Sequence, residues 1–201
     1  MNIIKKSIFL GLVLIFITSS ISAFSFASEE KDYINRTLEL LDEEKYNEAV
    51  GELEEALMLI KSKADLEYVN VTYTEDEAWG FGMYNPRENS TFAQGETFFI
   101  YGEAKNYTIK ETEKDLYEIY LKEDIYILDQ DNNVLFGQAD FLDYHIMSHS
   151  RNFDLFINNT ITQTSPFPVG NYKFRLVLKD VFSQKTTEAI IEFTVTEKST
   201  T

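Results

Sequence analysis

The chain has 201 residues, with 34 acidic and 18 basic side chains and a formal net charge of −16. Nucleic-acid phosphates and anionic membrane surfaces repel so acidic a protein, so we expect no nucleic-acid partner. The sequence contains no cysteine, which excludes disulfide bonds and a lipid-modified cysteine anchor. Stability must therefore come from the packing of a core.

Residues 1–27 are predicted to be a secretory signal peptide. Two lysines precede an apolar run over 8–17, and Ser25 and Ala27 supply the small residues before a cleavage site. The alternative is a retained anchor helix, because a bilayer crossing needs about 20 residues and 7–27 would suffice. With either alternative, the rest of the chain is secreted or lies in the cell envelope, and only the second gives it a membrane contact.

Residues 28–66 are predicted to form an antiparallel helical hairpin. Apolar residues recur at helical spacing in two stretches that are joined by the short link LDEEKYN. Such a pair cannot bury its own apolar side, so it must pack on the β domain, on a partner protein or on a second copy. The candidate partner-binding residues are Leu38, Leu41, Leu53 and Leu57.

The second half of this hairpin resembles the second helix of a tetratricopeptide repeat. The resemblance is carried by Tyr46-Asn-Glu-Ala49-Val50, followed by Leu53 and Ala56-Leu57, with Tyr33 at the aromatic position of the first helix. Thr37 stands where the family prefers a smaller residue, and Lys61 where it often has proline. No second repeat follows, so the resemblance implies a single helix pair.

From Tyr68 onward the apolar period changes from 3.6 to 2, which predicts a β domain over 67–197. The candidate strands are 68–73, 79–84, 96–103, 117–122, 125–128, 134–136, 153–158, 172–178 and 189–195. Short strands with a clear inside and outside predict a mainly β fold, an antiparallel β-sandwich preceded by the helical hairpin. Residues 198–201 are predicted to be a disordered tail.

The last two strands resemble those of immunoglobulin-like modules of secreted and surface proteins. Pro168-Val-Gly170 leads into an alternating strand, and an Asp-containing turn over 180–185 leads into a second one. The resemblance implies an immunoglobulin-like sandwich and says nothing about function. It also implies that Tyr172 is a corner tyrosine whose hydroxyl bonds to nearby backbone.

Four residues of the segment over 79–87 are candidates for ligand binding. Trp79, Phe81 and Tyr84 either form an aromatic platform for a sugar ring or pack into the core. Arg87 is expected to pair with a carboxylate, because arginine is scarce in this sequence and acidic residues are plentiful.

Two further patterns share part of the spacing of known metal sites. His145 and His149 have the spacing of two ligands on one helix turn, but their surroundings predict an exposed loop. Asp129, Asp131 and Asn133 begin like a calcium-binding loop, yet the glycine that such a loop needs is missing, so we expect a hairpin turn. We expect no metal site, no cofactor and no catalytic residue.

The sequence favours an exported, non-enzymatic protein that binds or scaffolds other proteins, through a partner or through self-association of the hairpin. One alternative is a carbohydrate-binding module that uses the aromatic platform. Another is a secreted hydrolase whose site is not recognisable from sequence, since 34 acidic residues nominate no particular pair.

Overall fold

The computed structural model describes residues 28–163 and 165–198 of the chain. In this part, two helices precede nine strands. The elements are α1 (Glu29–Asp42), α2 (Tyr46–Lys63), β1 (Glu67–Thr74), β2 (Thr91–Ala93), β3 (Phe98–Lys105), β4 (Lys110–Glu113), β5 (Leu116–Leu128), β6 (Val134–Ser148), β7 (Leu155–Ile161), β8 (Gly170–Asp180) and β9 (Thr186–Thr196). The predicted signal peptide, residues 1–27, and residues 199–201 of the predicted tail lie outside the described residues.

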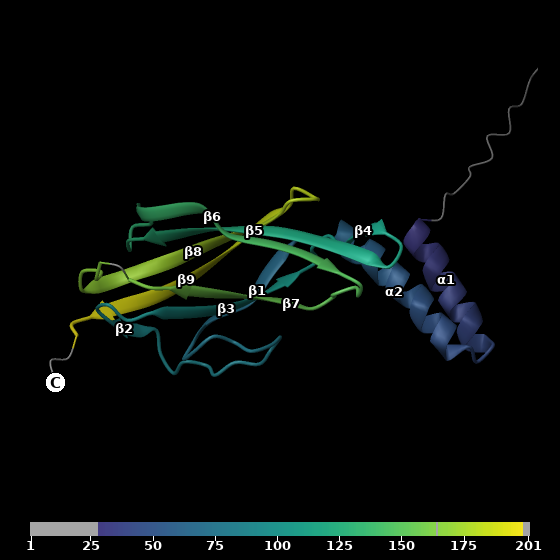
Figure 1. The fold of residues 1–201 in the computed structure, drawn as a ribbon, viewed down its shortest axis with the longest axis horizontal. Coiled ribbons are helices and arrows are strands. Elements are labelled where there is room, and N and C mark those ends of the chain that lie inside the picture. Colours follow the sequence, from purple (N-terminus) through teal and green to yellow (C-terminus); the bar gives the residue numbers. More distant parts are fainter. Residues whose placement is uncertain (1–27, 164, 199–201) are drawn as a thin grey trace, which may run out of the picture.

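The strands form two sheets that face each other (Figure 1). One sheet has the order β1-β3-β7, and the other has the order β2-β9-β8-β5-β4, with β6 also paired to β5. All pairs are antiparallel except β2 and β9, which run parallel. The prediction of a mainly β, largely antiparallel sandwich behind a helical hairpin is confirmed.

The facing sides of the two sheets share one hydrophobic core. Along β8, alternate side chains point inward and are buried, as the period of two predicts: Tyr172, Phe174, Leu176 and Leu178. From the other sheet, the ring of Phe98 lies edge-on to Phe174, with 5.2 Å between centroids. Aromatic pairs of this kind bury large areas in a favourable geometry, so they hold the two sheets together.

The helical hairpin lies at one end of the sandwich (Figure 1). Lys61 Nζ donates a 2.8 Å hydrogen bond to the carbonyl of Phe153, and Lys185 Nζ donates one of 2.6 Å to the carbonyl of Ser62. Arg151, after β6, pairs with Glu55 of α2. All these bonds come from the second half of α2. The core cluster of the described residues contains no residue of α1 or α2, whereas Leu66, the last residue of the predicted hairpin, belongs to the core.

The predicted strand over 79–84 is wrong. The chain between β1 and β2 is a loop, in which Gly80 and Met83 form an isolated bridge and Gly82 has a φ of 66°. Asn158 of β7 holds this loop, because its side chain donates to Ala78 O at 2.8 Å and accepts from Ala78 N at 3.3 Å. The loop therefore covers the outer side of the three-stranded sheet instead of extending it.

A β-bulge lies within one strand that the sequence divides in two. The predicted strands over 117–122 and 125–128 are one strand, β5, whose register with β6 shifts between Glu123 and Ile125. On β6, Asp140 has a φ of 48°, and its N–H donates to Asp124 Oδ1 at 2.7 Å. The shift interrupts the alternation of buried residues that sequence reasoning relies on. Strand β6 also extends to Ser148, so His145 lies on a strand and not in the predicted loop.

The predicted hydrogen bond from Tyr172 to nearby backbone is confirmed. Tyr172, near the start of β8, donates a hydrogen bond of 3.0 Å from its hydroxyl to the carbonyl of Pro168. This bond fixes the approach of the chain to β8 while the ring packs into the core.

Candidate functional site

Small side chains set the interface between α1 and α2. Thr37, Ala49 and Ala56 are the buried residues of the two helices, and their size lets the helices approach closely. Across the interface, Arg36 Nε lies 3.3 Å from Glu52 Oε2. This ion pair places the middle of α1 level with the middle of α2.

Eight large hydrophobic side chains of the hairpin are 36 to 61% exposed. They recur every three or four residues, and we name them the apolar stripe: Ile34, Leu38 and Leu41 in α1, and Tyr46, Val50, Leu53, Leu57 and Ile60 in α2. All four candidate partner-binding leucines belong to it. Exposed apolar patches on monomers are normally small, whereas this stripe runs along both helices.

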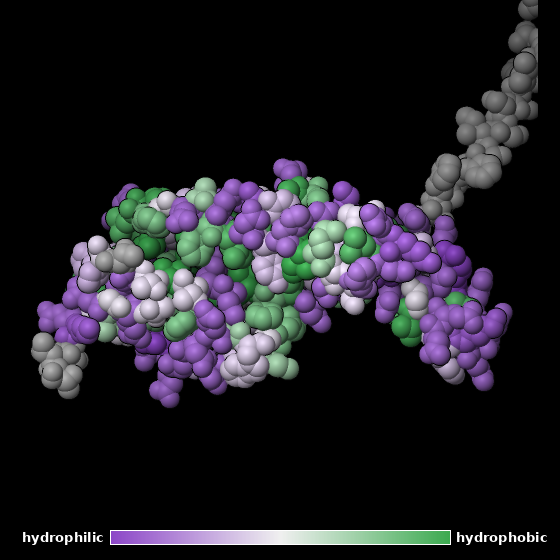
Figure 2. Space-filling view, viewed as in Figure 1, coloured by the Kyte–Doolittle hydropathy of each residue, from purple (hydrophilic) through white to green (hydrophobic). Residues whose placement is uncertain are grey.

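Both halves of the stripe lie on the same face of the hairpin. Residues at this spacing occupy one side of a helix. In each helix a stripe residue directly follows a buried interface residue, as Leu38 follows Thr37 and Leu57 follows Ala56. Because the two helices run antiparallel, this equal offset turns both halves to one side. Figure 2 shows hydrophobic residues at the surface of the hairpin among hydrophilic ones.

The other side of the hairpin is polar and faces the sandwich across a cleft of about 890 Å³. Carboxylates of the two helices line it, together with His149 and Arg151 from the end of the sandwich. Arg151 Nε donates to the hydroxyl of Tyr117 at 3.1 Å, so its two neighbours in the cleft are Tyr117 and Glu55. The sequence did not indicate this cleft, because its walls come from segments about a hundred residues apart.

The candidate aromatic residues of the loop over 79–87 do not share one face. Trp79 is 62% exposed, whereas Phe81 and Tyr84 are half-buried. Lys105 Nζ lies 4.2 Å from the ring centroid of Phe81, and the ring of Tyr84 packs on that of Tyr101 at 4.3 Å. Two of the three predicted platform residues are thus turned toward the three-stranded sheet.

Arg87 pairs with a carboxylate, as predicted. Its Nη2 lies 2.7 Å from Glu96 Oε1 and donates to the carbonyl of Thr91 at 2.9 Å. The guanidinium also lies over the ring of Phe92, 4.2 Å from the centroid. These contacts give Arg87 a structural role in holding the loop against β2.

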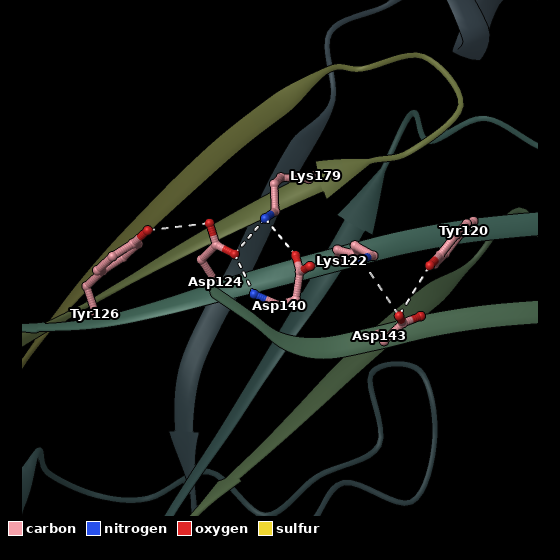
Figure 3. Close-up of polar contacts among 7 residues, drawn as sticks. All are labelled: Tyr120, Lys122, Asp124, Tyr126, Asp140, Asp143 and Lys179. Carbon is pink, nitrogen blue, oxygen red and sulfur yellow. Dashed lines mark hydrogen bonds and ion pairs between the residues drawn. The ribbon is translucent and has the colours of Figure 1, made fainter. Parts of the chain in front are cut away.

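A second polar cluster lies on the outer face of the six-stranded sheet, at the bulge (Figure 3). Lys179 of β8 lies 2.6 Å from Asp124 of β5 and 3.0 Å from Asp140 of β6, so it joins three strands. Burial alone would raise the pKa of Asp124. The hydrogen bonds from Lys179 and from the N–H of Asp140 outweigh that effect and lower the pKa below its ordinary value.

The same cluster continues along β5 and β6 (Figure 3). Lys122 lies 2.8 Å from Asp140, and the hydroxyl of Tyr120 donates to Asp143 at 3.2 Å. The charged groups of the cluster therefore bind one another, and the cluster stabilises the bulge.

The candidate metal residues are arranged differently from a metal site. Asp129 accepts hydrogen bonds from the backbone N–H groups of Asp131 and Asn133, which is the hairpin turn that was predicted. His145 Nε2 lies 2.6 Å from Glu118 Oε1, and His149 Nδ1 lies 2.9 Å from the carbonyl of Asp115. In residues 28–163 and 165–198, no group of three or more potential ligands could hold a metal ion.

One carboxyl group lies inside the core, which the sequence did not indicate. Glu123 of β5 is fully buried and accepts a hydrogen bond of 2.7 Å from Asn159 of β7 through Oε1. Its other oxygen, Oε2, is buried without a hydrogen-bond partner. Burial raises the pKa of this carboxyl to about 7. Glu123 occupies an inward position in the alternating pattern of β5, and this position could have indicated from the sequence that its side chain is buried.

The chain matches no protein-family model, and comparison with curated proteins finds no similar sequence. Among the helices that the structure describes, none is long and apolar enough to cross a membrane.

Proposed function

We propose that this is an exported, non-enzymatic protein that binds or scaffolds other proteins through the apolar stripe of its helical hairpin. The observation that carries the proposal is the exposure of eight large hydrophobic residues on one face of a hairpin that contacts the sandwich by another side. Burying such side chains is favourable by about 1.5–3 kcal/mol each, so covering this face with another protein surface would be favourable.

We further infer that the sandwich is an immunoglobulin-like carrier for this hairpin. Two features support this inference: the order β9-β8-β5 with β2 running parallel to β9, and the bond from Tyr172 to Pro168. The tetratricopeptide-like character of the hairpin is supported by the buried positions of Thr37, Ala49 and Ala56 between its helices. Export is supported by the pattern of residues 1–27, and it places the binding event outside the cytoplasm.

The test compares two substitutions in α2, in the chain that starts at Ser28, at a concentration where it is monomeric. Leu53→Glu, on the stripe, should change the free energy of unfolding by less than about 0.5 kcal/mol, because the side chain is already exposed. Ala56→Glu, in the helix interface, should cost more than about 2 kcal/mol. Equal losses in the two variants would show that the stripe belongs to the chain's own core, and the proposal would be wrong.

A further inference from the structure

The spacing of the apolar stripe is that of helices that pack on helices. In α2 the steps alternate between four and three residues, from Tyr46 through Val50, Leu53 and Leu57 to Ile60. In α1, Lys31 precedes Ile34, Leu38 and Leu41 with the same alternation. An average step of 3.5 residues keeps one seam along a helix, and such seams face other helices.

The two halves of the stripe are nearly symmetric about one level of the hairpin. In α2, Tyr46 and Ile60 lie seven residues before and after Leu53, whereas Val50 lies three residues before it and Leu57 four after it. In α1, Ile34 and Leu38 lie two residues before and after Arg36, and Lys31 and Leu41 lie five residues before and after it. Because Arg36 is bonded to Glu52, the neighbour of Leu53, the two midpoints lie at one level across the hairpin.

Resting on the proposed function, we infer that the stripe is covered by a second copy of this chain. The two hairpins stack face to face in an antiparallel four-helix bundle. The two-fold axis runs between the two hairpins, perpendicular to the helices, at the level of Arg36 and Leu53. Leu53 then packs beside its own symmetry mate, and Tyr46 meets Ile60 of the second copy. A two-fold interface requires a self-complementary surface, and the nearly symmetric spacing of the stripe meets this requirement.

The charges at the two ends of the α1 seam are complementary in this arrangement. Lys31 stands at one end and Asp42 at the other, and both are exposed. Within the described part of the chain neither forms an ion pair. The two-fold axis brings Lys31 of each copy to Asp42 of the other, so two ion pairs close the ends of the interface.

The experiment is sedimentation equilibrium of residues 28–201 over a concentration series. This chain contains every helix and strand that the structure describes. We expect a monomer–dimer equilibrium that Leu53→Glu weakens by about 100-fold or more, as for a central interface residue. Lys31→Asp and Asp42→Lys should each weaken it about two- to five-fold, and the double variant should restore it. Leu135→Glu, which changes an exposed leucine on β6, is the matched control and should have no effect.

A wild-type chain that stays monomeric at all concentrations would overturn the second-copy inference. If Leu53→Glu then leaves unfolding unchanged, the stripe still serves another protein and the proposed function survives; if it unfolds the monomer, both fail. A dimer that Leu135→Glu dissolves and Leu53→Glu does not would also overturn the inference, since it would form through β6.

Discussion

Lys61 of α2 reaches the carbonyl of Phe153 at 2.8 Å, and this bond is part of a small set that ties the hairpin to the sandwich. The Lys61 side chain also lies over the rings of Tyr107 and Phe153. Desolvation at this contact lowers its pKa from the ordinary value. The attachment is thus made by a lysine stem, an arginine and backbone carbonyls, and the apolar stripe takes no part in it.

The sandwich is therefore expected to fold without the hairpin. A chain that begins at Asp65 should unfold cooperatively in urea and lose less than about 2 kcal/mol, because the core cluster of the described residues has no member from 28–63. Noncooperative unfolding of the shortened chain would show that the helices complete the core.

A close contact inside the three-stranded sheet gives a sharp stability prediction. A side chain at Gly102 of β3 would lie 2.3 Å from the ring of Tyr68 on β1, which is itself buried. Gly102→Ala should therefore cost about 2 kcal/mol or more in urea unfolding. Gly51→Ala is the matched control, because a side chain at this position of α2 would meet open space. The higher helix propensity of alanine should stabilise the protein by about 0.5–1 kcal/mol. A neutral Gly102→Ala would contradict the packing of Tyr68.

The buried carboxyl of Glu123 should make stability depend on pH. Below about pH 4.5 it is protonated in both states, and between about pH 4.5 and 7 only the unfolded chain releases the proton. Stability should fall across this window by about 3 kcal/mol and level off above it. Glu123→Gln should remove that part of the pH dependence, so the difference in unfolding free energy between the two proteins should widen from pH 4 to pH 8. Parallel curves would mean that Glu123 is ionised or solvated in the native state.

The corner bond of Tyr172 should contribute measurably to stability. Tyr172→Phe removes the hydroxyl that donates to Pro168 O and keeps the ring in the core, so we expect a loss of about 1 kcal/mol. Tyr46→Phe, at an exposed tyrosine of the stripe, should change thermal unfolding very little. Equal effects of the two substitutions would argue against the bond.

Elements with an unbroken period were predictable from sequence. The helices and the last two strands follow the spacing of their apolar residues closely. The turn at Asp129 was predictable from its Asp and Asn residues. The bulge at Asp124 was not predictable, because it depends on the backbone of Asp140 on another strand. The aromatic residues of 79–84 predicted a strand. They pack instead on the outside of the three-stranded sheet, and the sequence alone does not show that this sheet lies beside them.

The candidate site was predictable in part, because the apolar residues of both helices have an unbroken helical spacing. The spacing of Leu38, Leu41, Leu53 and Leu57 indicated an apolar side for each helix. That these residues stay exposed depends on where α2 docks, which is decided by Lys61, Arg151 and Lys185 across more than 90 residues of sequence. The ion pair of Arg36 with Glu52, which aligns the two seams, is likewise a tertiary contact.

The central claim is that another protein chain covers the apolar stripe, and photo-crosslinking tests it most directly. A photoreactive amino acid would replace Leu53 on the stripe or, as a control, Leu135 on β6, in cells that produce and export the protein. We predict a discrete protein adduct from position 53, with the mass of a dimer, and none from position 135. Equal or absent crosslinking at the two positions would contradict the account.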